Sequence, residues 1–357
     1  MKNKRLICIH SIAGLFVGIF ILALSLSGGL LVFHDDIDAL QKPFFLPLKT
    51  GNQILSVDSY YKTIQQNYPQ AVISSCVVAK NKQQAFSFTI YDSSYQNGTT
   101  ALQVFLHPQT GTILKARGGS DDIKHNFMSW LAAFHSSFHA GKTGEWFLGF
   151  FAIIFLISIV SGIVLYRKNI AAVLLFKKTV WKRNNLHQLI GTGALLFNLM
   201  IGITGFWMQR YVFKKDFYQS SDWVNTIKPS PNLFFNFDSA YNGLQKLHPN
   251  FTGYVIYFAQ SKKGKTLIYG SNKTNAFIHS KKFADVIALD STGAIAKTRF
   301  INEIDASDRY DIINSQLHMG KYGGTTIKIV YGFFGLTSAF LCITGFLLWL
   351  KRRKSSI

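Results

Sequence analysis

The sequence predicts an α-helical membrane protein whose four transmembrane helices form two parallel repeats, each with an α+β domain outside the membrane. Charged residues make up only 15% of the 357 residues and apolar residues 48%, whereas soluble domains carry about a quarter charged residues. The charge deficit is concentrated in four windows, each long enough to cross the hydrocarbon core as a helix. The windows are Leu6–Phe33, Trp146–Tyr166, Leu186–Met208 and Ile329–Leu350.

The basic residues predict the orientation of the spans. The segments before the first window, between the second and third, and after the fourth hold 13 of the positive charges and no acidic residue. Short basic connections face the cytoplasm, so we expect both termini there. Most of the net charge of +21 is thereby a topology signal, and we expect the lipid bilayer, not nucleic acid, as a partner.

These signals divide the chain into alternating spans and soluble segments. The expected transmembrane helices cover residues 1–34, 145–166, 186–208 and 327–350. The expected outer domains cover residues 35–144 and 209–326. The expected cytoplasmic segments are a loop at 167–185 and a tail at 351–357.

Two histidine spacings occur in both halves of the chain, which indicates an internal duplication. His10 and His187 each precede a small pair by 17 residues, Ser27-Gly28 and Thr204-Gly205. His135 and His318 each precede another small pair by 26 residues. These second pairs are Ser161-Gly162 and Thr344-Gly345. Because both halves run from the inside to the outside and back, the repeats are expected to be parallel.

The outer segments follow one pattern as well. Helices are expected at Ser56–Asn67 and Phe237–Leu247, each followed by alternating strands such as Ala85–Tyr91 and Tyr254–Ala259. Both segments close on a turn-forming sequence, Pro108-Gln109-Thr110-Gly111 in one and Asp290-Ser291-Thr292-Gly293 in the other.

The four repeated histidines form two expected pairs, His10 with His187 near the cytoplasmic face and His135 with His318 near the outer face. Two imidazoles on facing helices suit the axial positions of a haem, which supplies the four equatorial nitrogens itself. Zinc fits less well, because it needs about four donors and no Cys, Asp or Glu accompanies either pair. A histidine at a membrane interface can also serve only as an anchor for its helix.

Two further histidines have no counterpart in the duplication. By spacing, the equivalents of His34 and His139 are Tyr211 and Tyr322. His139 lies one helical turn after His135, so either of them can be the outer ligand; His135 is the first choice, and His139 and His34 are second choices. The small Ser-Gly and Thr-Gly pairs are interpreted as positions where helices pack closely.

The motifs resemble the PepSY-associated transmembrane family over nearly the whole chain. The resemblance rests on Ile9-His10-x3-Gly14, Phe134-His135-x5-Gly141, Leu186-His187-x3-Gly191 and the run Leu317-His318-Met319-Gly320-Lys321-Tyr322-Gly323-Gly324. The Pro-Gln-Thr-Gly and Asp-Ser-Thr-Gly turns look like the ends of PepSY domains. The family includes inner-membrane ferric-siderophore reductases with two haems.

This resemblance implies a multi-pass protein of the bacterial inner membrane with PepSY-like periplasmic domains and two non-covalent b-type haems, ligated by His10, His135, His187 and His318. The haems are expected to carry electrons to a ferric siderophore or other ferric chelate, which makes the protein a haem-dependent oxidoreductase for iron uptake. The electrons would come from a cytoplasmic carrier or a membrane quinol. The alternative is a non-redox membrane protein whose PepSY-like domains bind peptide or protein partners.

Overall fold

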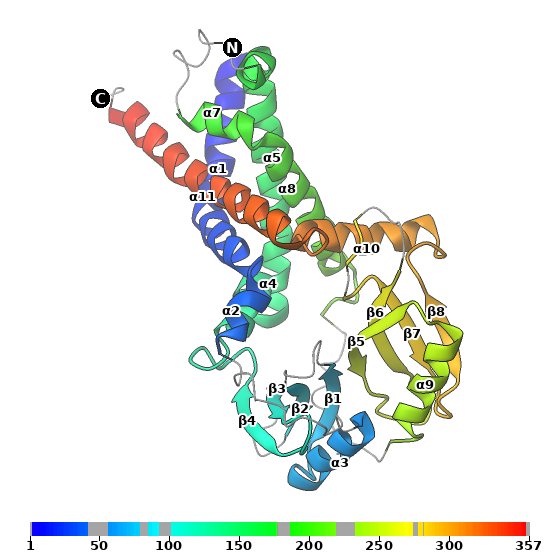
Figure 1. The fold of residues 1–357 in the computed structure, drawn as a ribbon. Coiled ribbons are helices and arrows are strands. Elements are labelled where there is room, and N and C mark those ends of the chain that lie inside the picture. Colours follow the sequence, from blue (N-terminus) through cyan, green and yellow to red (C-terminus); the bar gives the residue numbers. More distant parts are fainter. Residues whose placement is uncertain are drawn as a thin grey trace. The chain divides into compact units, whose positions relative to one another are not determined.

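The computed structural model describes residues 2–41, 56–78, 85–92, 101–175, 177, 186–218, 233–273, 278–280 and 282–354. The chain folds into two compact units (Figure 1). The helical unit comprises Met1–His34, Leu131–Gln219 and Asn314–Ile357. The sheet unit comprises Asp35–Trp130 and Ser220–Ile313, so it combines parts of both predicted outer domains.

The helical unit is built around long apolar helices. It contains α1 (Lys2–Leu31), α5 (Gly141–Leu174), α7 (Leu186–Gly193), α8 (Leu195–Gln209), the 3₁₀ helix η2 (Arg210–Phe213) and α11 (Gly324–Lys354), together with the C-terminal parts of α4 (Phe127–Ser137) and α10 (Ala306–Met319). Within the described residues, α1, α5 and α11 are each long and apolar enough to cross a membrane. The protein is therefore a multi-pass membrane protein.

The predicted third span is not one straight helix. α7 and the continuous stretch Leu195–Phe213 meet at an angle of 64°, with Ala194 at the break in a non-helical conformation. The break follows Gly191-Thr192-Gly193, and glycine weakens a helix interior because it has no side chain to restrict the backbone. α5 continues to Leu174, so the first part of the predicted loop 167–185 is helical. Of the rest of that loop, the structure describes only Leu175 and Lys177.

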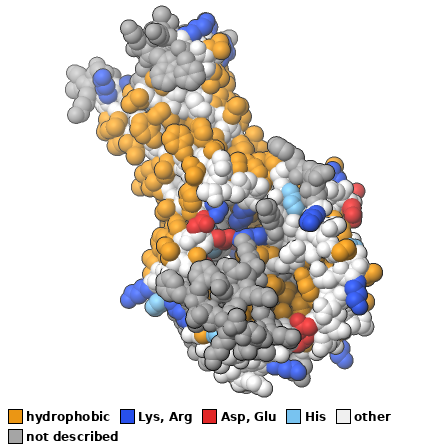
Figure 2. Space-filling view, viewed as in Figure 1, with side chains coloured by type: hydrophobic (Ala, Val, Ile, Leu, Met, Phe, Trp, Pro, Cys, Tyr) orange, Lys and Arg blue, Asp and Glu red, His pale blue; other side chains and the backbone are white. Residues whose placement is uncertain are grey.

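Apolar side chains cover much of the face of the helical unit that Figure 2 shows. Ile12, Ile19 and Phe333 are each more than 60% exposed, as expected for side chains that contact lipid. Inside the unit, hydroxyl and amide groups join the helices. Ser25 on α1 accepts a hydrogen bond from the Ala339 N–H on α11 (3.0 Å), and Ser338 on α11 donates to Asn198 on α8 (2.9 Å). Such bonds satisfy polar groups where no water is present.

The sheet unit is one antiparallel sheet of eight strands, in the order β4-β3-β2-β1-β5-β6-β7-β8. Its strands are β1 (Val72–Val77), β2 (Phe86–Tyr91), β3 (Ala101–Leu106), β4 (Ile113–Gly118), β5 (Phe251–Tyr257), β6 (Thr266–Asn272), β7 (Asp285–Leu289) and β8 (Ile295–Arg299). The two central strands join the two halves of the chain, with Cys76 opposite Ile256. This pairing extends the two four-stranded meanders into one sheet.

One hydrophobic core runs under both halves of the sheet. The helices α3 (Val57–Asn67) and α9 (Phe237–Leu247) bury Tyr61 and Phe237 against Phe88, Phe258 and further strand residues. The predicted helix Phe237–Leu247 is α9 with the same bounds. Both predicted turns close their hairpins at a glycine with positive φ, 69° at Gly111 and 86° at Gly293, a conformation that other residues adopt only with strain.

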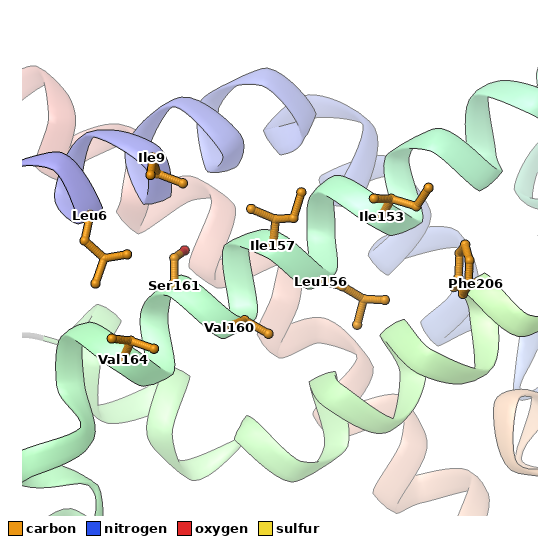
Figure 3. Close-up of a pocket in the computed structure, with 9 residues that line it drawn as sticks. All are labelled: Leu6, Ile9, Ile153, Leu156, Ile157, Val160, Ser161, Val164 and Phe206. Atoms are coloured by element: carbon orange, nitrogen blue, oxygen red, sulfur yellow. The ribbon is translucent and has the colours of Figure 1, made fainter.

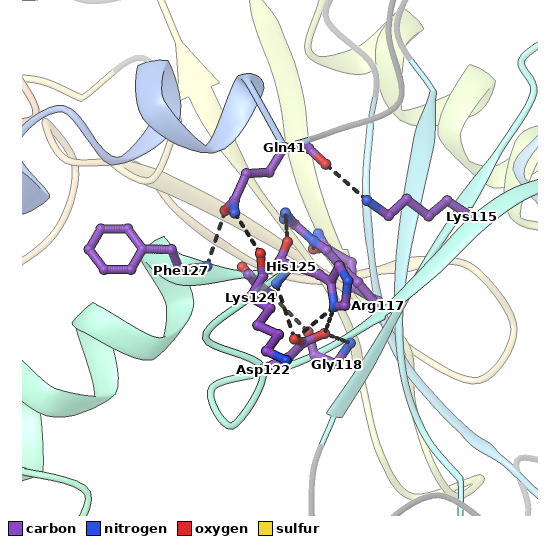
Figure 4. A network of polar contacts seen from close by, with 10 residues as sticks. Gln41, Lys115, Arg117, Gly118, Asp122, Lys124, His125 and Phe127 are labelled. Atoms are coloured by element: carbon purple, nitrogen blue, oxygen red, sulfur yellow. Dashed lines mark hydrogen bonds and ion pairs between the residues drawn. The ribbon is translucent and has the colours of Figure 1, made fainter.

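A buried network fastens the short helix α2 (His34–Ala39) to the sheet (Figure 4). The Arg117 guanidinium on β4 pairs with Asp38 on α2 at 2.7 Å, and both side chains are almost fully buried. Arg117 also donates to Gln103 Oε1 (2.8 Å) and to the His125 carbonyl (3.0 Å). Gln41, just after α2, accepts from the Phe127 N–H that begins α4 (3.1 Å). The segments that leave α1 and enter α4 are thus bound to one edge of the sheet.

Asp58 and Asp238 join the first turns of α3 and α9. Asp238 accepts from the N–H groups of Val57 (3.1 Å) and Asp58 (2.9 Å), and Asp58 accepts from those of Phe237 (3.0 Å) and Asp238 (2.8 Å). Burial and the adjacent Asp238 carboxyl raise the pKa of Asp58 to about 6. Burial opposes ionisation of Asp238 too, but hydrogen bonds from Asp58 and from backbone N–H groups hold its pKa below the usual value. The pair therefore shares one proton in mildly acidic conditions.

Replacing Arg117 by Met should strongly destabilise the sheet unit. The substitution leaves Asp38 charged and buried, which costs about 3–5 kcal/mol when one partner of a buried pair is removed. The measurement is chemical unfolding of the purified protein in detergent. The matched control is Arg299→Met, because Arg299 pairs with Asp308 at 3.4 Å near the surface and such pairs contribute about 1 kcal/mol or less. Equal losses in the two variants would contradict the role given to Arg117.

The carboxyl pair should make the sheet unit less stable as the pH rises from about 4 to about 7, because the pKa of Asp58 is raised from 3.8 to about 6 in the folded chain. The contribution of Asp58 is therefore present at low pH and is lost as the pH rises through its folded-state pKa. Thermal unfolding across this range measures the slope. Asp58→Asn should flatten the slope, whereas the turn variant Asp290→Asn should keep it, since hydrogen bonds from Thr292 hold the pKa of Asp290 below its usual value. An unchanged slope in Asp58→Asn would refute this assignment.

Candidate functional site

The helical unit brings the four repeated histidines together as two pairs. The ring centroids of His10 on α1 and His187 on α7 lie 6.3 Å apart. Those of His135 on α4 and His318 on α10 lie 6.5 Å apart. Each pair joins one histidine from the first half of the chain to one from the second half.

His10 is held by α5. Its Nδ1 lies 2.9 Å from the Ser158 carbonyl oxygen and 3.0 Å from Ser161 Oγ. A carbonyl oxygen only accepts hydrogen bonds, so Nδ1 carries the proton and donates to both oxygens. The neutral ring then has its lone pair on Nε2, the nitrogen on the opposite side of the imidazole.

The other three histidines are held in the same manner. Their Nδ1 atoms lie 2.9 Å from Ser27 Oγ (His135), 2.9 Å from Thr344 Oγ1 (His187) and 3.0 Å from Thr204 Oγ1 (His318).

A glycine follows each of the four hydroxyl residues and makes room for the imidazole. A Cβ added at Gly28 would lie 3.0 Å from His135 Cε1, and one at Gly205 would lie 3.0 Å from His318 Cε1. The corresponding distances are 3.2 Å from Gly162 to His10 and 3.3 Å from Gly345 to His187. Any larger residue would push the ring away from the helix that holds it.

Each histidine is therefore held by its own half of the chain and faces the other half. Within the first half, α1 and α5 hold His135 and His10; within the second half, α8 and α11 hold His318 and His187. In the described part of the chain, Nε2 of these rings makes no hydrogen bond. The free edge of each ring is thus available to whatever lies between the pair.

Packing contacts fix the helices that carry His135 and His318. The Asn314 amide on α10 donates to the Thr204 carbonyl (3.2 Å), and the Tyr331 hydroxyl on α11 donates to the Leu317 carbonyl (2.7 Å). On the other side, Phe138 at the end of α4 contacts the rings of Phe20 and Phe151. These contacts position the turns on which His135 and His318 lie.

A scan against protein-family models matches the PepSY-associated TM region over residues 8–352. The match includes all four paired histidines and nearly the whole chain. This chain belongs to the PepSY-associated transmembrane family. A search of curated proteins finds no match.

In this member of the PepSY-associated family, His139 and His34 lie outside the pairs. α4 ends at Ser137, and Phe138 and His139 follow with positive φ angles of 50° and 57°. The His139 ring is exposed and lies 6.3 Å from the Phe134 ring on α4, whereas the ring that lies beside His318 is that of His135. His34 begins α2. Of the two histidines that the sequence left open, His135 is the one that faces His318.

Each pair offers two donor atoms and no more. Among the described residues, no three His, Cys, Asp or Glu side chains converge on one point. A site with two protein donors suits a group that brings its own remaining ligands, and a haem macrocycle brings four.

An apolar pocket of about 490 Å³ adjoins the His10 anchor (Figure 3). Ile9 on α1, Ile157 and Val160 on α5, and Phe206 on α8 belong to its lining. Ser161 also lines it, and its hydroxyl is a hydrogen-bond partner of His10. The lining is otherwise aliphatic or aromatic, so the surroundings of this histidine are poor in water and strengthen its few polar contacts.

The sequence interpretation of the Ser-Gly and Thr-Gly pairs as packing positions was incomplete. The glycines do allow close approach, but to imidazole rings, and the hydroxyls are the hydrogen-bond partners of the histidines. The available signal was the constant spacing of 17 or 26 residues between each histidine and a small pair. By spacing, each histidine is associated with one small pair of its half. Its hydrogen bond, however, is made to the hydroxyl of the other small pair of that half.

Proposed function

We propose that this protein is a transmembrane di-haem electron carrier that reduces ferric chelates, such as ferric siderophores, on the outer side of a bacterial inner membrane. The observation that carries the proposal is the pair of facing histidines at two places in one apolar helical unit. Membership of the PepSY-associated family supports a membrane protein of this type.

The spacing of the rings fits a metal held between them. An imidazole nitrogen binds a metal at about 2 Å and lies about 1 Å from its own ring centre, so two rings on opposite sides of one ion have centroids about 6 Å apart. The centroid separations in the structure are 6.3 and 6.5 Å. The Nδ1–H donors of all four rings are engaged, which leaves Nε2 as the ligand atom. The residues present therefore fit two bis-histidine haems.

The depth of the two pairs fits a path across the membrane. His10 belongs to the first pair, and Gly28, on the same helix α1, contacts His135 of the second pair. At 1.5 Å per residue, these 18 positions span about 27 Å. The hydrocarbon core is about 30 Å thick, so the two pairs would lie near its opposite faces.

The proposal includes four spans arranged as two parallel repeats, with both termini in the cytoplasm. The first turn of α1 and the last turn of α11 lie at the same end of the helical unit (Figure 1), which an even number of crossings requires. The bent pair of α7 and α8 supplies the fourth crossing if it counts as one span. The strand order, in which β1 and β5 meet at the centre of two equal meanders, supports the duplication.

A bound haem supplies one-electron chemistry, because its iron is stable as Fe(III) and as Fe(II). The chain itself supplies the ligands, their orientation and an apolar surrounding. A cytoplasmic carrier or a membrane quinol would deliver electrons on the side of His10 and His187. The sheet unit has exposed lysines that would attract anionic ferric chelates. They are Lys246, Lys262, Lys263, Lys265, Lys273 and Lys297.

Alanine variants of the paired histidines should each lose about one of two haems. His10→Ala and His187→Ala remove ligands of one proposed haem, and His135→Ala and His318→Ala remove ligands of the other. Insertion into the membrane should persist, since it depends on the apolar helices. Haem per polypeptide is measured by the reducible Soret band. His139→Ala and His34→Ala are the controls and should keep both haems.

Two results would contradict the haem assignment. Full haem content in His187→Ala would exclude the first pair as ligands. Colourless wild-type protein after expression with haem available would favour the non-redox alternative, in which the PepSY-like domains bind peptide or protein partners.

The proposed acceptor is tested with fully reduced protein under anaerobic conditions. Addition of a ferric hydroxamate together with a ferrous trap should oxidise the haems and produce one trapped Fe(II) per electron. The reason is that reduction weakens the hold of hard oxygen ligands on iron. The control is the same chelate with His318→Ala protein. Haems that stay reduced against several chelate types would rule out ferric chelates as acceptors even if both haems were present.

A further inference from the structure

The four hydroxyl residues Ser27, Ser161, Thr204 and Thr344 occupy equivalent positions, each hydrogen-bonded to the Nδ1 of one paired histidine. We propose that they are positioning residues, which fix the histidine tautomer and thereby set the affinity and the reduction potential of the haem. This inference rests on the proposed function. It assigns a role to residues that do not touch the haem iron.

The direction of each hydrogen bond follows from the proton of the hydroxyl. Thr204 Oγ1 donates to the Met200 carbonyl (2.7 Å), one turn earlier on α8, and Ser27 Oγ donates to the Ala23 carbonyl (2.9 Å) in the same way on α1. A hydroxyl has a single proton to donate. With that proton directed to the backbone carbonyl, the hydroxyl oxygen accepts from the imidazole, and this assigns the hydrogen to Nδ1.

The other two positions lead to the same result. Thr344 donates to the Phe340 carbonyl (2.9 Å) on α11, and Ser161 donates to the Ser158 carbonyl (2.9 Å) on α5. For His10, the Ser158 carbonyl, which accepts from Nδ1 (2.9 Å), requires the same proton position. All four rings are thus prepared as ligands through Nε2 before any metal is bound.

The hydroxyl changes the strength of the ligand as well as its orientation. An acceptor on the remote N–H of a metal-bound imidazole makes the ring a better electron donor, and loss of such partners typically weakens metal binding by about 10- to 100-fold. A better donor stabilises Fe(III) more than Fe(II), which lowers the reduction potential. Removal of the hydroxyl should therefore weaken haem binding and raise the potential of that haem alone.

The chain offers a matched pair of substitutions for a test. Thr204→Val keeps the shape of the side chain but removes the hydroxyl, and Thr204→Ser keeps the hydroxyl. Serine is compatible with this geometry, because Ser27 makes the same contacts in the first half. Both variants and the wild type are purified as full-length protein, loaded with haem and titrated with dithionite. The haem that is lost in His318→Ala identifies the outer site.

The expected result for Thr204→Val is haem affinity about 10- to 100-fold lower at the outer site and a more positive potential there, with the inner haem unchanged. Thr204→Ser should match the wild type. An unaltered outer haem in Thr204→Val would overturn the inference, and so would equal shifts in Val and Ser, since the effect would then come from packing. Both results leave the proposed function intact.

The positioning role of the hydroxyl residues can be tested separately from the proposed haem function if the protein binds no haem. If the wild type binds no haem, the proposed function fails, but the tautomer can still be read from the ¹⁵N chemical shifts of the histidine rings. Protonated Nδ1 at His318 in the wild type and a mixture of tautomers in Thr204→Val would support the positioning role. The same mixture in both proteins would overturn it.

Discussion

The hydrogen bond from each histidine Nδ1 to a hydroxyl of its own half determines the arrangement of the helical unit. Because α5 holds His10 and α11 holds His187, the free edges of the two rings can meet only between the halves. The same holds for His135 and His318 at the other pair. Polar side chains within lipid are costly unless satisfied internally, and this arrangement satisfies one nitrogen of every ring while leaving the other for a ligand.

The sheet unit joins the two halves in a different way. Backbone pairing of β1 with β5 makes one sheet, and Asp58 and Asp238 exchange backbone hydrogen bonds above it. Both the strand pairing and the Asp58–Asp238 hydrogen bonds connect corresponding positions of the two halves. Each half leaves a strand edge and a helix N-terminus unsatisfied, and the other half supplies the complement.

Spacing and periodicity predicted much of this fold, but tertiary contacts decided the rest. The positions of α3, α9 and the two hairpin turns followed from local pattern, as did the grouping of the histidines into two pairs. The break at Ala194 was missed because the span was predicted from hydropathy and the absence of Asp, Glu, Lys and Arg from Leu186–Met208, and neither reports helix geometry. The sequence favoured His135 over His139 by spacing but left the choice open, because the helix end at Ser137 depends on the packing of Phe138 against α1 and α5.

The hydroxyl residues show why a packing interpretation of small residues is insufficient in an apolar helical unit. A glycine that serves only helix contact needs no particular neighbour, yet all four glycines here follow a residue whose hydroxyl accepts from the ring that the glycine admits. The glycine thus provides space for the imidazole ring, and the residue before it provides the hydroxyl that bonds the ring. A serine in the first half and a threonine in the second meet the same requirement, because the shared hydroxyl is the group that the imidazole contacts. Each paired histidine therefore needs its own hydroxyl partner beside a glycine, and either serine or threonine can supply that hydroxyl.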